Sequence, residues 1–226
     1  MTIPRPFSFI LTMLLATTPA AAGTASYRGD IDADANRDFF EDVAGRPVTE
    51  LVITSMGGSV EAAIALGRWV NERGMDVVVE AYCLSACANY VFPAGRHKVI
   101  RPGAVVAWHG SYRHLVETGQ WRDDARARMA RHGEDEATAG ARARAAARRL
   151  AALEDDFFEH IGVDGHLAWV GKMPPHRVPD YYTLPVADMA RFGVTAVKAP
   201  PAYPPADLSQ VDAHITPIRL DPEPAP

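Results

Sequence analysis

The stretch Glu80-Ala81-Tyr82-Cys83-Leu84-Ser85-Ala86-Cys87-Ala88-Asn89-Tyr90-Val91 places a serine between a predicted strand and a predicted helix. The run Asp76-Val77-Val78-Val79 before it is typical of a buried strand, and the apolar residues after Ser85 follow a short helical pattern that Pro93 and Gly95 end. Ser85 would then begin a helix, where free N–H groups and the helix dipole favour negative charge. A serine at such a place is often only a helix cap, but the place also suits the formation of an oxyanion.

Two further stretches carry chemistry-bearing residues at the ends of predicted strands. Ser55-Met56-Gly57-Gly58-Ser59-Val60 is a Gly-rich turn that follows the apolar run at residues 50–54. Val105-Val106-Ala107-Trp108-His109-Gly110 ends an apolar strand on a histidine, 24 residues after Ser85. The chain therefore contains a Gly-rich strand-to-helix turn, a serine at a second such turn and a histidine that closes a strand.

In this order and at these spacings, the three segments resemble the Clp-type serine peptidases of the Clp/crotonase superfamily. Gly29-Asp30-Ile31 is similar to the family's first strand and Ala190-Arg191-Phe192-Gly193-Val194 to its closing helix-Gly segment, so the likeness covers roughly residues 26–197. The resemblance implies an α/β fold of stacked ββα repeats around a mainly parallel sheet. The alternation of strand and helix patterns favours the same parallel sheet with crossover helices.

The resemblance also assigns roles at the site. Ser85 matches the nucleophile and His109 the general base, which a serine hydroxyl needs because it is a weak nucleophile at its free pKa. The backbone N–H groups of Gly58 and Ala86 match the two donors of the oxyanion hole, an arrangement that can be the largest single catalytic contribution. Met56 stands where the family has a proline, and an ordinary tight turn is the alternative interpretation of these glycines.

Asp180 is the candidate for a third catalytic residue, since the family places an aspartate shortly before an aromatic residue and the closing helix. Its role would be to orient the imidazole and stabilise the imidazolium. A surface-loop aspartate is an equal interpretation, Asp164 and Asp188 are rivals, and a Ser-His pair without an acid is also open. His97 and His114 are alternative bases, but their polar neighbours predict exposure to solvent.

Cys83 and Cys87 flank Ser85 in a C-x-S-x-C arrangement. Across the first turn of a helix the two Cα atoms lie near the separation that a disulfide tolerates. We therefore expect a disulfide that clamps the turn, with two reduced core cysteines as the alternative. We expect no metal site, because two cysteines are too few ligands.

The first 22 residues have the pattern of a secretory signal peptide: Arg5, an apolar run over residues 7–16 and Ala20-Ala21-Ala22 as a small-residue cleavage site. The expected organisation is a signal peptide at 1–22, a Clp/crotonase-like domain at 23–197 and a proline-rich, largely disordered tail at 198–226. An exported, periplasmic bacterial protein is predicted, with no membrane span in the mature chain, in a compartment that permits disulfides.

Between residues 134 and 162, apolar side chains step by three or four and predict one long amphipathic helix. Its arginines are flanked by acidic residues, and the chain carries a formal net charge of −5, so no nucleic-acid partner is expected. Because the Clp-type folds that this chain resembles often assemble through such a segment, a homo-oligomer interface is one hypothesis.

The sequence thus predicts a serine hydrolase that acts without ATP or any other cofactor on peptide or unfolded-protein substrates. One alternative is a Clp-like binding or assembly protein of the periplasm that has lost turnover. The other is an acyl-thioester enzyme of the crotonase branch, which export disfavours because coenzyme A is cytosolic.

Overall fold

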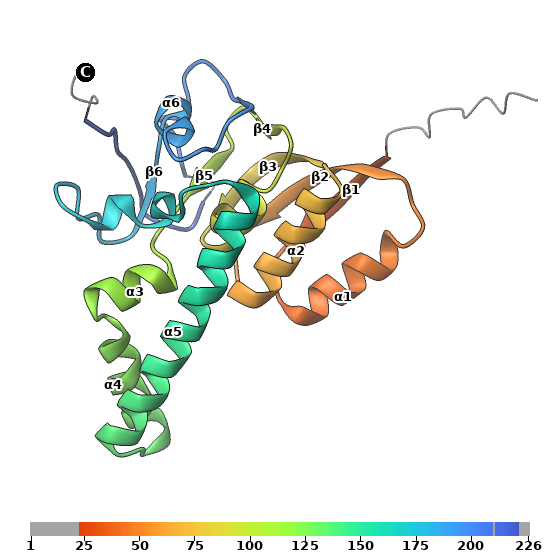
Figure 1. Ribbon diagram of the computed structural model, residues 1–226. Helices are drawn as coiled ribbons and strands as arrows, with labels where there is room; N and C mark the ends of the chain where they lie inside the picture. Colours follow the sequence, from red (N-terminus) through yellow and green to blue (C-terminus); the bar gives the residue numbers. More distant parts are fainter. Residues whose placement is uncertain (1–22, 210, 222–226) are drawn as a thin grey trace, which may run out of the picture.

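A parallel β-sheet forms the centre of the protein. The structure is a computed structural model that describes residues 23–209 and 211–221 (Figure 1). The sheet has the strand order β1-β2-β3-β4-β7, with β5 paired to β3, and every strand pair in it is parallel. Its strands are β1 (Gly23–Arg28), β2 (Val48–Ser55), β3 (Asp76–Leu84), β4 (Lys98–Ile100), β5 (Val105–Ala107) and β7 (Val197–Lys198). The predicted α/β fold with a mainly parallel sheet is confirmed.

Strand β3 is nine residues long and changes partner along its length. Its first part, Val77 to Val79, pairs with β4, whereas Tyr82 to Leu84 pair with β5. The sequence predicted a strand that runs up to the serine, and it gave no indication of this change of partner. The second part carries the chain to the serine turn with β5 as its direct neighbour.

Helices α1 (Ala33–Asp42) and α2 (Val60–Glu72) follow β1 and β2 and lie together on one face of the sheet (Figure 1). Each begins at a side-chain cap: Asp32 accepts from the Ala35 N–H at 2.8 Å, and Ser59 accepts from the Ala62 N–H at 3.3 Å. A Cβ at Gly67 would collide with a carbonyl oxygen of the helical turn that follows the serine. This glycine therefore lets α2 approach the serine turn closely.

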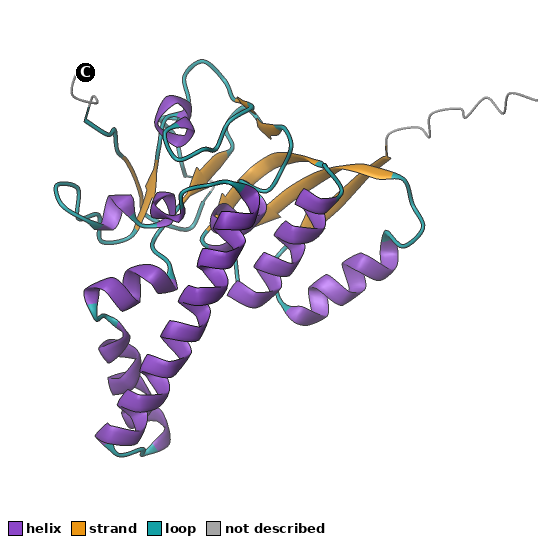
Figure 2. Cartoon of the chain, viewed as in Figure 1, coloured by secondary structure: helices purple, strands orange, loops and turns teal. Residues whose placement is uncertain are grey.

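The second half of the chain contributes a helical arm made of α3 (Tyr112–Thr118), α4 (Trp121–His132) and α5 (Glu136–Ile161), which extends away from the sheet (Figures 1 and 2). The predicted long helix is α5, which spans 26 residues between an Asp135 cap and Gly162 at φ 68°. Two one-turn helices, η2 (Gly165–Ala168) and η3 (Val170–Lys172), then lead to β6 (Tyr181–Thr183) and α6 (Val186–Ala190).

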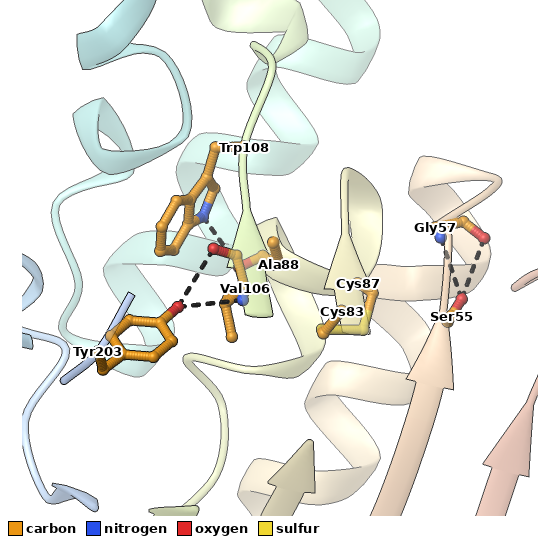
Figure 3. Close-up of a disulfide and its surroundings, with 8 residues drawn as sticks. All are labelled: Ser55, Gly57, Cys83, Cys87, Ala88, Val106, Trp108 and Tyr203. Carbon is orange, nitrogen blue, oxygen red and sulfur yellow. Dashed lines mark hydrogen bonds between the residues drawn. A yellow bond between two sulfur atoms is a disulfide. The ribbon is translucent and has the colours of Figure 1, made fainter. Parts of the chain in front are cut away.

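The segment after Lys198 differs from the disordered tail that its prolines predicted. Strand β8 (Ile215–Pro217) pairs in parallel with β6, and Val211, Ile215 and Ile218 are buried. The phenol of Tyr203 lies against β5, 3.1 Å from the Val106 N–H (Figure 3). Apolar side chains between the prolines hold this segment on the domain, because proline removes a backbone donor but does not prevent packing at an edge strand.

The predicted signal peptide, residues 1–22, and the last five residues of the predicted tail lie outside the described residues. Within the part that the structure describes, no helix combines the length and the apolar character that crossing a membrane requires.

Candidate functional site

The register of two parallel strands brings Ser85 and His109 together. Leu84 at the end of β3 pairs with Ala107 at the end of β5, and the Ser85 N–H donates to the Ala107 carbonyl at 3.1 Å. Because parallel strands end at the same edge of a sheet, the residues that follow both strands share that edge. The result is a distance of 2.6 Å between Ser85 Oγ and His109 Nε2, which is a hydrogen bond.

The backbone of Ser85 is in the left-handed region, with φ at 52°. A non-glycine residue rarely adopts this conformation, and such strain is concentrated at functional sites. After Ser85 the chain forms a helical turn of π type, η1 (Cys87–Val91), all of whose residues are buried. The sharp turn presents the Ser85 hydroxyl at the surface while the helix that follows it is covered.

A disulfide between Cys83 and Cys87 spans this turn, with the two Cα atoms 5.2 Å apart (Figure 3). It joins the end of β3 to the first residue of η1, and both cysteines are fully buried. Trp108 supports η1 from the side of β5, since its Nε1–H donates to the Ala88 carbonyl at 3.2 Å. The serine is therefore held between a covalent clamp and the strand that carries the histidine.

The Gly57-Gly58 turn packs directly against the serine turn. A Cβ at Gly57 would lie 2.8 Å from the Ser85 Cβ, and one at Gly58 would collide with the Ile31 carbonyl oxygen, so neither glycine can be replaced without movement. Ser55 fixes the start of the turn, because its hydroxyl accepts from the Gly57 N–H at 3.0 Å (Figure 3). Among the described residues, no group accepts the N–H of Gly58.

The Ala86 N–H is similarly left without an acceptor in residues 23–209 and 211–221. Gly58 and Ala86 both line a pocket of about 230 Å³ together with Ser85 and His109. The four residues that the sequence predicted for the site, which supply the hydroxyl, the imidazole and the two amides, thus border one cavity. Residues of α3 and α5 also line it.

The His109 imidazole packs on the ring of Tyr181 at this pocket, with the centroids 4.5 Å apart and the planes at 34°. Burial lowers the pKa of His109, and the charge of Lys172 lowers it further. A neutral imidazole is the form that can accept a proton. The electrostatics of the site therefore keep His109 in the form that a general base needs.

The candidate acids lie elsewhere. Asp180 is exposed, its backbone carbonyl accepts from Lys172, and its carboxylate makes no hydrogen bond to His109 within the described residues. Asp164 caps η2 by accepting from the His166 N–H at 2.9 Å. The carboxylate of Asp188 accepts from the Leu220 N–H at 3.1 Å. Within the described residues, no hydrogen bond joins any of the three carboxylates to His109.

The two alternative bases are also placed by the structure. His97 lies at an exposed position and its Nδ1 is 2.9 Å from Asp76, on the far part of β3 from the serine. His114 differs from its prediction, because it is buried: it stacks on Trp169 with the centroids 5.8 Å apart and lines the pocket beside His109. Ser111 caps α3 by accepting from the His114 N–H at 3.3 Å.

Two polar residues of the pocket were not found from the sequence. Asn89 is buried one turn after Ser85 and donates to the Gly110 carbonyl at 3.0 Å, while its Oδ1 has no partner in the described residues. Glu154 of α5 is 1% exposed and accepts from the Tyr90 hydroxyl and, at 2.9 Å, from the Tyr112 N–H. Burial raises the pKa of the Glu154 carboxyl. Each had a signal in the sequence, since each is a polar residue on an otherwise apolar helix face.

Over residues 23–209 and 211–221, no group of three or more His, Cys, Asp or Glu side chains has the arrangement of a metal site.

Comparison with known proteins gives likenesses of structure. No family model matches the sequence, and no curated protein matches it. A solved structure of ClpP1 from Listeria monocytogenes matches 54% of this chain and 78% of its own, at 18% identity and a TM-score of 0.33. A point mutant of the same ClpP1 matches 77% of this chain and 90% of its own, at 18% identity and a TM-score of 0.39. A mutant of the 1510-N membrane-bound stomatin-specific protease matches 52% of this chain and 66% of its own, at 11% identity and a TM-score of 0.32.

Proposed function

We propose that this protein is a serine hydrolase in which Ser85 attacks a carbonyl carbon and His109 accepts the hydroxyl proton. The observation that carries the proposal is the hydrogen bond of 2.6 Å between Ser85 Oγ and His109 Nε2. The strained backbone of Ser85 and the lowered pKa of His109 support it, because both favour a reactive serine-base pair.

In this proposal the N–H groups of Gly58 and Ala86 stabilise the oxyanion of the tetrahedral intermediate. Both groups border the pocket of Ser85 and neither has an acceptor within the described residues, so both are available to a substrate oxygen. His109 then returns its proton to the leaving group, and a water molecule attacks the acyl-enzyme by the same path in reverse. These steps require no metal ion and no nucleotide.

The site operates as a Ser-His pair, since Asp180 does not reach the imidazole. Peptide bonds are the proposed substrate class, on the resemblance of the three sequence motifs to Clp-type peptidases. The disulfide supports export to an oxidising compartment such as the periplasm. Because such a compartment lacks an ATP-driven partner, the enzyme would act alone on short or unfolded peptides.

A fluorophosphonate probe tests the proposal, because it labels only an activated serine. We expect the wild-type protein to be labelled, Ser85→Ala to be unlabelled and His109→Ala to be labelled at a rate lower by about 10²-fold or more. Labelled wild-type protein should then cleave unstructured peptides more slowly than unlabelled protein in proportion to the labelled fraction.

The missing acid favours a second candidate, a binding or assembly protein that keeps the fold without turnover. Folded, oxidised protein that resists labelling and still binds an unstructured peptide would establish this second function and exclude the first.

A further inference from the structure

His109 lacks the partner that usually orients a catalytic histidine. In serine hydrolases that partner is a carboxylate hydrogen-bonded to the second ring nitrogen, and within the described part of this chain no carboxylate makes that bond. The groups that lie beside the imidazole are instead the ring of Tyr181 and the cation of Lys172.

Lys172 ends η3 and lines the same pocket as Ser85 and His109. Its Nζ donates to three successive carbonyl oxygens, those of Val178 at 3.0 Å, Pro179 at 2.7 Å and Asp180 at 2.8 Å. A lysine ammonium has three N–H donors, so every one of them is used. The segment over residues 178–180 is therefore wrapped around one cation.

This segment leads directly into Tyr181, the residue that packs on the imidazole. On its other side the chain is tied to the strand of His109, because the Tyr182 and Trp108 backbones exchange two hydrogen bonds of 2.8 and 2.9 Å. Tyr181 is thus fixed between the lysine clamp and the end of β5. The backbone that carries the ring is therefore attached on both sides of Tyr181.

We propose that Lys172 is a positioning residue for His109, which gathers the carbonyl oxygens of residues 178–180 and so holds the Tyr181 ring as a platform against the imidazole. The inference rests on the proposed function, in which His109 is the general base. The platform replaces the directional bond of a carboxylate with ring packing from one side and the Ser85 hydrogen bond from the other.

The positive charge of Lys172 also changes the pKa of His109, in the direction opposite to the effect of a carboxylate. It lowers the pKa of His109 in addition to the effect of burial, whereas an acid would raise it. Tyr181 packs on the imidazole, and the other titratable groups that line the pocket with His109 are Tyr90, Tyr112, His114 and Glu154. Asp180 acts on Lys172 and raises its pKa. The base should therefore remain neutral to a lower pH than an ordinary histidine, with less affinity for the proton.

The test measures the rate of fluorophosphonate labelling as a function of pH in Lys172→Met, Tyr181→Ala and the double variant. NMR of the imidazole nitrogens, with His109→Gln for assignment, follows the titration of His109 without needing activity. In Lys172→Met we expect the plateau rate to fall about tenfold, because the imidazole is misplaced, and the apparent pKa of His109 to rise toward the usual value of about 6.5.

Because Lys172 acts through Tyr181, the double variant should label no more slowly than the slower single variant. Tyr181→Phe keeps the ring and should label faster than Tyr181→Ala. Lys98→Met is the matched control: Lys98 lies on β4, is buried where Lys172 is half-buried, and donates to the Thr195 carbonyl at 3.0 Å. It should lower stability without moving the titration of His109.

A Lys172→Met protein with the wild-type labelling rate and the wild-type titration of His109 would overturn the positioning role and leave the proposed function standing. Absence of labelling in the wild type, together with a shifted His109 titration in Lys172→Met, would refute the proposed function and keep the positioning role. If Lys172→Met does not fold, the pair Tyr181→Phe and Tyr181→Ala decides: equal labelling rates in the two refute the platform.

Discussion

Removal of the disulfide should change the reactivity of Ser85 as well as the stability of the fold. The perturbation is the double variant Cys83→Ala/Cys87→Ala, which leaves the hydroxyl and the imidazole intact. The bond joins residues only four apart, and closing so small a loop contributes about 2 kcal/mol by chain entropy. The free energy of unfolding should therefore fall by about this amount, plus a smaller loss for the two buried sulfur atoms.

The strain at Ser85 has a similar size. A left-handed backbone costs a residue other than glycine about 1–2 kcal/mol, and the φ of Ser85 is 52°. Without the bond, the turn can relieve this strain by relaxing toward ordinary backbone angles, which moves the hydroxyl away from His109. If the whole 2 kcal/mol is lost from the reactive conformation of the serine turn, labelling slows by about 30-fold. If only part of it is lost, the decrease is a fewfold.

Urea unfolding measures the first quantity and the rate of fluorophosphonate labelling measures the second. Reduction of the wild type, followed by intact mass, provides a reversible control, because reoxidation should restore the rate. A double variant that is destabilised as expected but labels at the wild-type rate would refute the connection between the bond and the serine turn.

Three substitutions and one pH dependence test other parts of the site and fold. Asp180→Asn should leave the labelling rate within twofold, because the carboxylate does not contact the imidazole; a decrease of a hundredfold or more would restore Asp180 as the acid. Gly58→Ala should abolish labelling and lower the melting temperature, since the new Cβ meets the Ile31 carbonyl oxygen at a φ of 146°. Tyr203→Phe should lower the free energy of unfolding by about 1 kcal/mol in a urea titration, because it removes the hydroxyl that accepts from the Val106 N–H; an unchanged value would mean that this hydrogen bond does not stabilise the fold. Burial lowers the pKa of His114, so the unfolded chain binds more protons below about pH 6.5 and stability should fall as the pH drops through that range; His114→Gln should flatten the decline.

The sequence predicts the parts of the site that depend on strand order. Ser85, His109 and Gly58 each come directly after a strand with a clear apolar pattern, and a parallel sheet brings strand ends to one edge. The order of the motifs along the chain is therefore enough to predict their convergence. The disulfide was predicted from the geometry of a helical turn, whereas in the structure it joins the end of β3 to the start of η1 across the left-handed Ser85.

The parts that the sequence did not predict depend on packing between distant segments. Lys172 and Tyr181 lie in a stretch of short turns with no periodic pattern, and no local rule indicates that a lysine will gather three carbonyl oxygens. The proline density of the C-terminal segment predicts disorder, whereas the apolar residues between the prolines are buried in the structure. Proline content limits which backbone hydrogen bonds a segment can make. The burial of Val211 and Ile215 depends instead on the apolar residues of β3 and β5 against which they pack.

The two halves of the candidate site consequently differ in what maintains them. The hydroxyl and the amides are held by covalent and local restraints: a disulfide across five residues, a glycine turn and one strand register. The imidazole is held by a segment that reaches it from about 70 residues further along the chain, through Lys172 and Tyr181. Disturbance of the second half should spare the oxyanion hole and weaken the base. The chemistry of this protein should therefore be most sensitive to change at residues 172–182, which the motifs of the sequence do not include.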